Sequence, residues 1–312
     1  MPSLKTIRKR IGSVKSTQKI TRAMKMVAGA RLARAQQRIT SLRPYALKTQ
    51  EILEGVTSAL ASGASANDAG PGDDAGSGGG EKPAHKLLAR RRIKKALFVV
   101  LSSDRGLCGG YNGNIVKLAL REWEARKAED VEVTFATVGK KAREAIIRKK
   151  GTVVKDFPKI YDGLDLSKAK IVAEYLTEQF LKSEVDAIYV LYTEFKSAMT
   201  QKPSVQQLLP LAEPPVKAED KDGTTTATTY DFEPSERVLL SRLVPMYIEI
   251  SLYKALLDSQ ASEFGARMTA MDSATRNAKD MIARLTLVYN RARQAAITKE
   301  LMEIIGGAEA LK

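Results

Sequence analysis

Apolar residues recur with a seven-residue period at both ends of this 312-residue chain. Successive repeat positions are three or four residues apart and average 3.5, the spacing at which two α-helices wind around each other in a left-handed supercoil. The N-terminal positions are Leu4, Ile7, Ile11, Val14, Gln18, Thr21, Lys25, Ala28, Leu32, Ala35, Ile39, Leu42, Ala46, Thr49, Leu53, Val56 and Leu60. The C-terminal positions are Met246, Ile250, Tyr253, Leu257, Gln260, Phe264, Met268, Met271, Ala274, Ala278, Met281, Leu285, Val288, Ala292, Ala295, Lys299 and Met302. We therefore predict a long antiparallel two-helix coiled coil formed by the two chain ends, each helix reaching about 85 Å at about 1.5 Å per residue.

The boundaries of these helices follow from capping residues and prolines. The first helix is predicted over residues 1–60, with Ser3 as N-cap because a serine hydroxyl can accept a bond from the first turn. Pro44 lacks an N–H donor and is expected to bend the helix. The repeat keeps its phase across Pro44, so the helix is expected to continue. The second helix is predicted over residues 234–312, with Pro234 at an early position where proline is favoured.

The residues between the two predicted helices do not follow the seven-residue repeat. Residues 61–92 are predicted to be a flexible linker or insertion, since 61–82 are almost wholly small and polar, and 213–233 an exposed loop. In 93–212, apolar strands alternate with helices, which implies a mostly parallel sheet in a Rossmann-like α/β domain. The predicted strands are 93–102, 131–138, 152–157, 186–194 and 202–211, and the predicted helices 112–127, 140–150 and 167–183. The predicted fold class is therefore mixed: a coiled coil plus an α/β domain.

The positive charge of the chain is concentrated in the first helix. Residues 1–50 contain thirteen Lys and Arg and no acid, whereas the rest of the chain contains 38 basic and 36 acidic residues. The formal net charge of the whole chain is +15. A solvated helix face normally mixes both signs. Three interpretations remain open: a nucleic-acid-binding helix, a targeting presequence, or a helix that lies against an acidic protein surface.

The residues that carry chemistry are scarce. One cysteine, Cys108, and one histidine, His85, exclude a disulfide within the chain, a His/Cys metal cluster and a Ser-His-Asp arrangement. The glycine cluster at 103–114 follows a strand and precedes a helix, but its spacing matches neither nucleotide-binding signature, so a packed turn is favoured. No apolar run has the roughly 18 residues of a membrane span. We predict no catalytic residue, no cofactor and no metal.

Polar residues interrupt the repeat at a few positions. Gln18, Thr21 and Lys25 form a polar patch in the first helix, and such residues either set the register of a coiled coil or contact a further partner. Near the other end, Arg293 and Gln294 are good donors for a carboxylate. Residues 301–312 form an apolar tip.

Several motifs, in this order, resemble those of the gamma subunit of rotary F-type ATP synthase. They are Ile7–Ile11, Thr17–Ala28, Arg43-Pro44-Tyr45, Ser103–Gly110 and the segment Glu263–Glu303, above all Ala270–Ala278. The match covers both helices and the start of the α/β domain. The segments 62–82 and 213–230 depart from the pattern and look like local insertions.

The resemblance implies a central shaft without catalytic residues, enclosed by a hexamer of alpha and beta subunits. It implies an α/β domain that stands on the membrane c-ring beside the epsilon subunit, and proton-driven rotation that forces each beta subunit through ATP synthesis. It also implies contacts with the head. Met24 and Lys25 are expected to face the acidic loop region of the beta subunits. The catch contacts higher in the head are expected from Arg293, Gln294, Thr298 and Glu300. The C-terminal tip, which would turn inside a sleeve formed by the head, contains Met302, Ile304 and Ile305.

Two other functions compete with this one. A nucleic-acid binder would use the basic helix, yet Tyr45 is the one aromatic residue in 1–50. A nucleotide-dependent enzyme is disfavoured by the glycine spacing. We expect no nucleic-acid partner, no membrane insertion, and a peripheral location on the cytoplasmic side of a bacterial plasma membrane.

Overall fold

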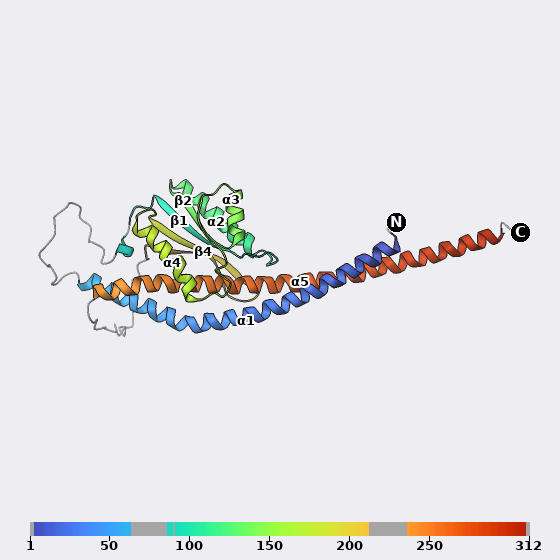
Figure 1. Cartoon of the computed structure of the whole chain (residues 1–312), viewed down its shortest axis with the longest axis horizontal. Coiled ribbons are helices and arrows are strands. Elements are labelled where there is room, and N and C mark those ends of the chain that lie inside the picture. Colours follow the sequence, from blue (N-terminus) through green and yellow to red (C-terminus); the bar gives the residue numbers. More distant parts are fainter. Residues whose placement is uncertain (1–2, 64–85, 90, 212–235, 310–312) are drawn as a thin grey trace, which may run out of the picture.

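The computed structural model describes residues 3–63, 86–89, 91–211 and 236–309. Two long helices form a shaft, and an α/β domain is attached near one end of it (Figure 1). Helix α1 spans Leu4–Gly63 and helix α5 spans Glu236–Glu309. Three predicted features lie outside the described residues: most of the linker, the loop at 213–233, and Pro234 at the expected start of the second helix.

The start of α1 and its proline agree with the predictions. The Thr6 N–H donates to the Ser3 hydroxyl at 3.3 Å, which confirms Ser3 as the N-cap. Pro44 lies inside α1 without ending it, and the helix continues to Gly63 instead of residue 60.

Helices α1 and α5 run antiparallel in a constant register. The contacts that define it are Arg8 with Tyr289, Thr21 with Thr275, and Lys25 with Asp272, and the residue numbers of each pair add to 296 or 297. Every predicted repeat position from Leu4 to Val56 is buried or half-buried. The predicted coiled coil is therefore confirmed along α1.

After Ala278 the predicted positions Leu285 and Ala292 of α5 are half-buried, but the intervening positions differ from the prediction by one residue. The predicted positions Met281 and Val288 are exposed, whereas Ile282 and Tyr289 are half-buried. The order of the three- and four-residue steps is therefore the reverse of the predicted order after Ala278, while the seven-residue period is kept. The prediction was wrong at Met281 and Val288 because a heptad repeat fixes the period of the seam but leaves open which of two adjacent apolar residues is covered.

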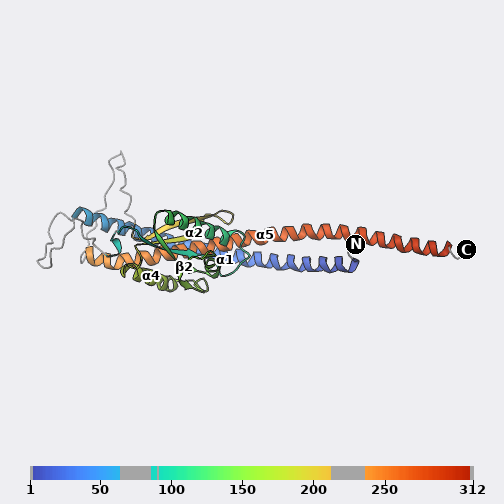
Figure 2. The ribbon, with the colours of Figure 1, turned by 90° about the horizontal axis from the view of Figure 1, so that it is seen from above.

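Helix α5 continues beyond the end of α1 as a single helix (Figures 1 and 2). The register places Leu4 opposite residue 293, so residues 294–309, here called the tip, have no α1 segment beside them. The predicted seam positions Ala295, Lys299 and Met302 are accordingly exposed.

The α/β domain is built on a five-stranded sheet with the order β3-β2-β1-β4-β5. The strands are β1 Lys95–Leu101, β2 Glu132–Val138, β3 Val153–Phe157, β4 Ala187–Phe195 and β5 Gln201–Leu209. The first four are parallel, as predicted, and β5 pairs antiparallel with β4 at one edge. A single 3₁₀ turn at Lys86–Leu88 precedes the sheet.

Alternate residues of β1 face two separate cores, as the period of two in a strand requires. Ala96, Phe98 and Val100 face helices α2 (Tyr111–Ala128) and α3 (Lys140–Arg148). The other face carries Leu97, Val99 and Leu101, covered by α4 (Leu166–Leu181) and α5. Helix α5 is therefore both half of the shaft and a covering helix of the domain (Figure 1).

Candidate functional site

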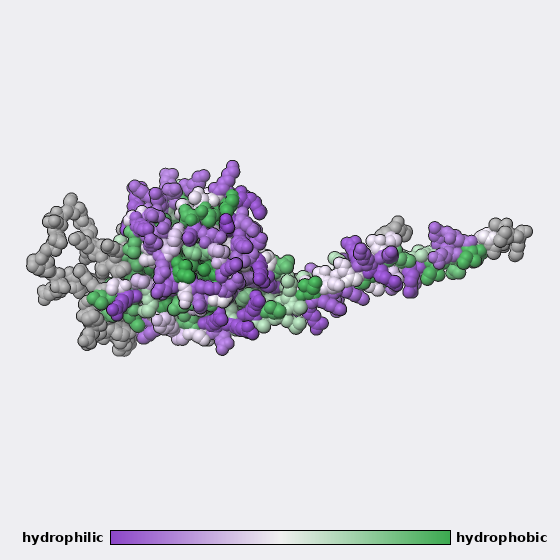
Figure 3. Space-filling view, viewed as in Figure 1, coloured by the Kyte–Doolittle hydropathy of each residue, from purple (hydrophilic) through white to green (hydrophobic). Residues whose placement is uncertain are grey.

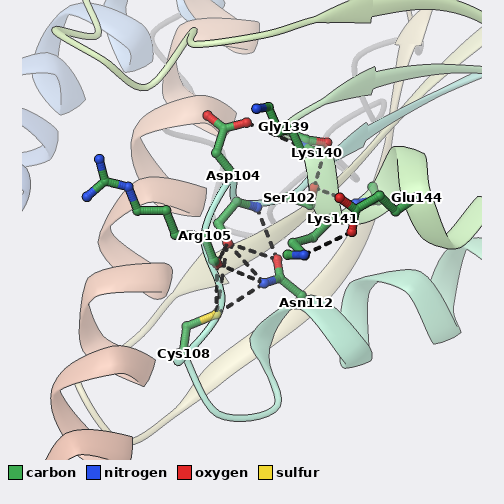
Figure 4. Close-up of polar contacts among 11 residues, drawn as sticks. Ser102, Asp104, Arg105, Cys108, Asn112, Gly139, Lys140, Lys141 and Glu144 are labelled. Atoms are coloured by element: carbon green, nitrogen blue, oxygen red, sulfur yellow. Dashed lines mark hydrogen bonds and ion pairs between the residues drawn. The ribbon is translucent and has the colours of Figure 1, made fainter.

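The loop that follows β1, here called the β1 loop (102–112), caps the start of α3 (Figure 4). Its acceptors for the first N–H groups of α3 are Asp104 Oδ1 for Lys140 at 3.1 Å, Ser103 O for Lys141 at 3.2 Å, and Ser102 Oγ for Ala142 at 2.9 Å. A phosphate at this helix terminus would need those N–H groups free. The glycine-rich segment is thus a packed turn, as its spacing indicates.

Gly139, directly before α3, is needed for this close approach. Its φ is +93°, and a Cβ there would lie 2.3 Å from the Ser102 carbonyl oxygen. Only glycine fits such a backbone conformation at this distance. The ends of β1 and β2 are therefore held together at this edge of the sheet.

Asn112 organises the interior of the β1 loop. Its Oδ1 accepts from the Ser103 N–H at 3.0 Å, and its Nδ2 donates to Ser103 Oγ at 2.9 Å and to Cys108 Sγ at 3.2 Å. Cys108 is buried, and this burial raises the pKa of its thiol. A protonated, enclosed thiol is a poor nucleophile, so Cys108 has a packing role.

The β1 loop is also fixed to the shaft. Arg267 of α5 donates to the Gly106 carbonyl at 2.9 Å and forms an ion pair with Glu263 one turn earlier. The two side chains are 16% and 11% exposed, so the pair is largely removed from water. Burial raises the pKa of Glu263, and Arg267 opposes that rise. These contacts join the loop of the domain to the C-terminal helix.

A groove of about 630 Å³ lies where α1, the β1 loop and α5 meet. Its apolar wall on α1 consists of Ile20, Met24 and Val27, which are 58%, 38% and 54% exposed. Its charged residues are Arg31, Arg105, Lys140, Lys159 and Arg267, with Asp104, Asp162 and Glu263. Figure 3 shows that apolar surface continues on the shaft beside the domain. An apolar wall with surplus positive charge suits an acidic, amphipathic partner segment.

Lys25 has a partner within the chain. Its Nζ lies 2.5 Å from Asp272 Oδ1, and Thr275 donates to the Thr21 hydroxyl at 2.8 Å one layer away. The hydrogen bond from Lys25 lowers the pKa of Asp272. The polar patch therefore bridges α1 and α5, which supports a register-setting role. The Lys25 side chain is still 43% exposed, so a contact with a further partner stays a prediction.

The residues predicted at the far end are all exposed and lie on the tip or at its base. This set comprises Arg293, Gln294, Thr298, Glu300, Met302, Ile304 and Ile305. Thr298 donates to the Gln294 carbonyl at 3.0 Å, a bond within the helix. Met302, Ile304 and Ile305 are 64%, 68% and 61% exposed, an unusual density of apolar side chains in water. Lys25 pairs with Asp272, whereas this group begins at Arg293, so the two predicted sets lie at different levels along α5.

Sequence reasoning missed part of the groove. Arg267, Glu263 and Arg31 were not singled out, although Glu263 and Arg267 have the i, i+4 spacing of a helical ion pair. Lys159 could not have been found, because the fold brings it there from a turn after β3. Within the described ranges, no three His, Cys, Asp or Glu side chains are grouped to hold a metal, and no helix is long and apolar enough to cross a membrane.

The fold and its surfaces define a shaft protein: two antiparallel helices, a bare tip, and an α/β domain fixed to the longer helix. The family model described as ATP synthase matches residues 3–311. The ATP synthase gamma chain of Sorangium cellulosum is 52% identical over the whole of both chains, and that of Geobacter sp. (strain M21) is 46% identical over the same extent. The chain therefore belongs to the ATP synthase gamma chain family, which confirms the resemblance seen in its motifs.

Solved structures share this fold at low identity. A chain from the cryo-EM structure of Euglena gracilis mitochondrial ATP synthase, OSCP/F1/c-ring, rotational state 3, gives a TM-score of 0.62 at 19% identity, over 99% of this chain and 94% of that one. A chain from the Tetrahymena thermophila mitochondrial ATP synthase central stalk/c-ring structure gives 0.57 at 22% identity, over 82% and 99%. The predicted fold class is confirmed.

Proposed function

We propose that this chain is the non-catalytic central rotor shaft of an F-type ATP synthase. In this role it couples proton-driven rotation of the membrane c-ring to the conformational cycling of the catalytic beta subunits. Family membership supports the proposal, and the tip is the observation that carries it. A helix that leaves its partner and exposes Met302, Ile304 and Ile305 needs an enclosing apolar surface, as a rotor tip inside a sleeve would have.

The two ends of the shaft are assigned different partners. The groove and the adjacent Met24 and Lys25 face the acidic loop region of the beta subunits, for which the groove's surplus positive charge is suited. The contacts higher in the alpha/beta head are made by Arg293, Gln294, Thr298 and Glu300. At the other end, the α/β domain stands on the c-ring beside the epsilon subunit. The structural neighbours, which come from a central stalk/c-ring structure and a rotor structure of mitochondrial ATP synthases, support this arrangement.

Shape asymmetry explains how such a shaft acts on three identical subunits. A ligand shifts a conformational equilibrium only by its differential affinity for the two states. The groove, the single-helix tip and the domain give the shaft a different surface in each direction, so each orientation favours a different beta conformation. We place the complex at a bacterial plasma membrane, with this chain peripheral on the cytoplasmic side; the bacterial sources of the relatives support that location.

Arg293→Ala and Gln294→Ala in the assembled complex test this role. Both side chains are exposed, so the chain should fold and assemble, while ATP hydrolysis and ATP-driven proton pumping should fall by about ten-fold if each makes a charge-assisted bond worth about 1.5 kcal/mol at the head. Arg284→Ala, an exposed arginine where α5 is paired with α1, serves as the matched control. Wild-type hydrolysis and pumping in both variants would refute the contact.

A further inference from the structure

A strongly cationic section of the shaft extends from the Thr21–Thr275 layer to the base of the tip. It consists of residues 3–22 of α1 and 275–293 of α5, which the register places side by side, and is here called the cationic belt. Its one acid is Asp280, and its basic residues, all exposed, are Lys5, Arg8, Lys9, Arg10, Lys15, Lys19, Arg22, Arg276, Lys279, Arg284, Arg291 and Arg293. The belt therefore carries +11 of the formal net charge of +15 of the whole chain.

Little of this charge is balanced within the described part of the chain. The ion pair that joins α1 to α5 is Lys25–Asp272, which lies just outside the belt, and none of the described ion pairs joins the two helices within it. Arg8 instead lies over the Tyr289 ring, 5.8 Å from its centroid, and donates to its hydroxyl at 3.1 Å. The belt is thus held across the seam by neutral groups.

The cations of the belt also repel one another along α1. Four like-charge pairs have the helical spacing of three or four residues: Lys5–Arg8, Lys5–Lys9, Lys15–Lys19 and Lys19–Arg22. Like charges at this spacing destabilise a helix. Because these side chains are exposed, salt screens their repulsion, with a Debye length of about 10 Å at 0.1 M.

The apolar seam that opposes this repulsion is thin. The buried side chains of the belt are Ile7, Thr21 and Ala278, and its other seam residues are half-buried. The two helices of the belt lie beyond the α/β domain, which covers the shaft only near its other end (Figures 1 and 2). Since the free energy of burial scales with the apolar area removed from water, little apolar burial stands against a net charge of +11.

We propose that the cationic belt is a charge-controlled zipper that closes on an acidic protein surface. In the free chain at low ionic strength, repulsion raises the fraction of molecules in which residues 3–22 are unpaired from α5. An acidic surface around the belt neutralises it, so the two helices pair and the shaft stiffens where it is enclosed. That this surface belongs to the alpha/beta head rests on the function proposed above, whereas the charge dependence is a property of this chain alone.

Amide hydrogen exchange on the full chain, without other subunits, measures the zipper. Protection of the amides in 3–22 should rise about ten-fold between about 20 mM and about 300 mM NaCl, because salt screens the repulsion along α1 and across the seam. At about 20 mM NaCl, poly-L-glutamate should produce at least the same rise. The amides of 28–56, where α1 also packs against the domain, should change less than about two-fold and serve as the internal reference.

A double charge reversal tests whether the belt causes this dependence. Lys5→Glu/Lys19→Glu turns all four like-charge pairs into opposite-charge pairs. This variant should be as protected at about 20 mM NaCl as the wild type is at about 300 mM, with no further effect of salt. Lys117→Glu/Lys149→Glu changes two exposed lysines of the α/β domain, makes the same change in net charge, and should behave as wild type.

Three results would each overturn the proposal. They are wild-type protection of 3–22 that does not depend on salt, a ten-fold dependence that survives in Lys5→Glu/Lys19→Glu, and poly-L-glutamate that leaves the protection unchanged. The first and third need no variant, so they stand even where a variant does not fold. Because no other subunit is present, these measurements can fail while the test with Arg293→Ala and Gln294→Ala succeeds, and the reverse.

Discussion

Replacement of Arg267 by alanine tests how firmly the β1 loop is held on the shaft. The substitution leaves the Glu263 carboxylate, 11% exposed, without its cation, and removing one partner of a buried pair costs about 3–5 kcal/mol. Because both side chains retain some contact with water, the low end of about 3 kcal/mol applies. The lost 2.9 Å hydrogen bond to Gly106 adds about 1 kcal/mol. Arg267→Ala should therefore lower the free energy of unfolding by about 4 kcal/mol.

Urea unfolding of the full chain, followed by far-ultraviolet circular dichroism, measures this loss. The double variant Glu263→Gln/Arg267→Met leaves no charge buried and should lose only about 1–2 kcal/mol. Without Arg267 the pKa of Glu263 rises further, so the deficit of the single variant should shrink as pH falls. A single variant within about 1 kcal/mol of wild type, or a double variant that loses as much as the single, would refute the reasoning.

Two further substitutions test the edge of the sheet and the register of the shaft. Gly139→Ala should lower the free energy of unfolding by at least about 2 kcal/mol, because its Cβ would collide with the Ser102 carbonyl; urea titration checks this, with Gly106→Ala, where a Cβ meets nothing within 4 Å, as control. Asp272→Lys should lower the free energy of unfolding by placing a second ammonium group against Lys25, and the exchange Lys25→Asp/Asp272→Lys should recover part of this loss, a recovery that high salt removes. Equal losses in the single and exchanged variants would contradict this account.

The regular parts of the fold could be predicted because their signals are local. The heptad repeat marks the seam along α1 up to Val56 and along α5 up to Ala278 without any tertiary information. The alternation of apolar strands with helices likewise predicted the five strands and the parallel sheet. Between Ala278 and Ala292 the repeat predicted Leu285 correctly but selected Met281 and Val288 where Ile282 and Tyr289 are the half-buried residues, since either of two adjacent apolar residues fits the period.

The contacts between the helices, the β1 loop and the sheet could not be predicted, because they depend on segments far apart in the chain. The length of the tip follows from the register that Thr21–Thr275 and Lys25–Asp272 set, and a repeat alone permits several registers. The groove required Lys159 and the β1 loop to meet α1 and α5 in space. The pattern also gave no sign that α5 covers one face of the sheet in addition to pairing with α1.

This double use of α5 has a mechanical consequence. The residues by which the sheet holds the helix, among them Leu252, Ala255 and Leu256, belong to the same unbroken helix as the tip. Helix α5 has no break between the α/β domain and the tip, so a torque applied to the domain reaches the tip through covalent bonds and helical hydrogen bonds. Helix α1 stiffens α5 where the two helices are paired. The tip, residues 294–309, has no paired helix and is therefore the most easily bent part of α5.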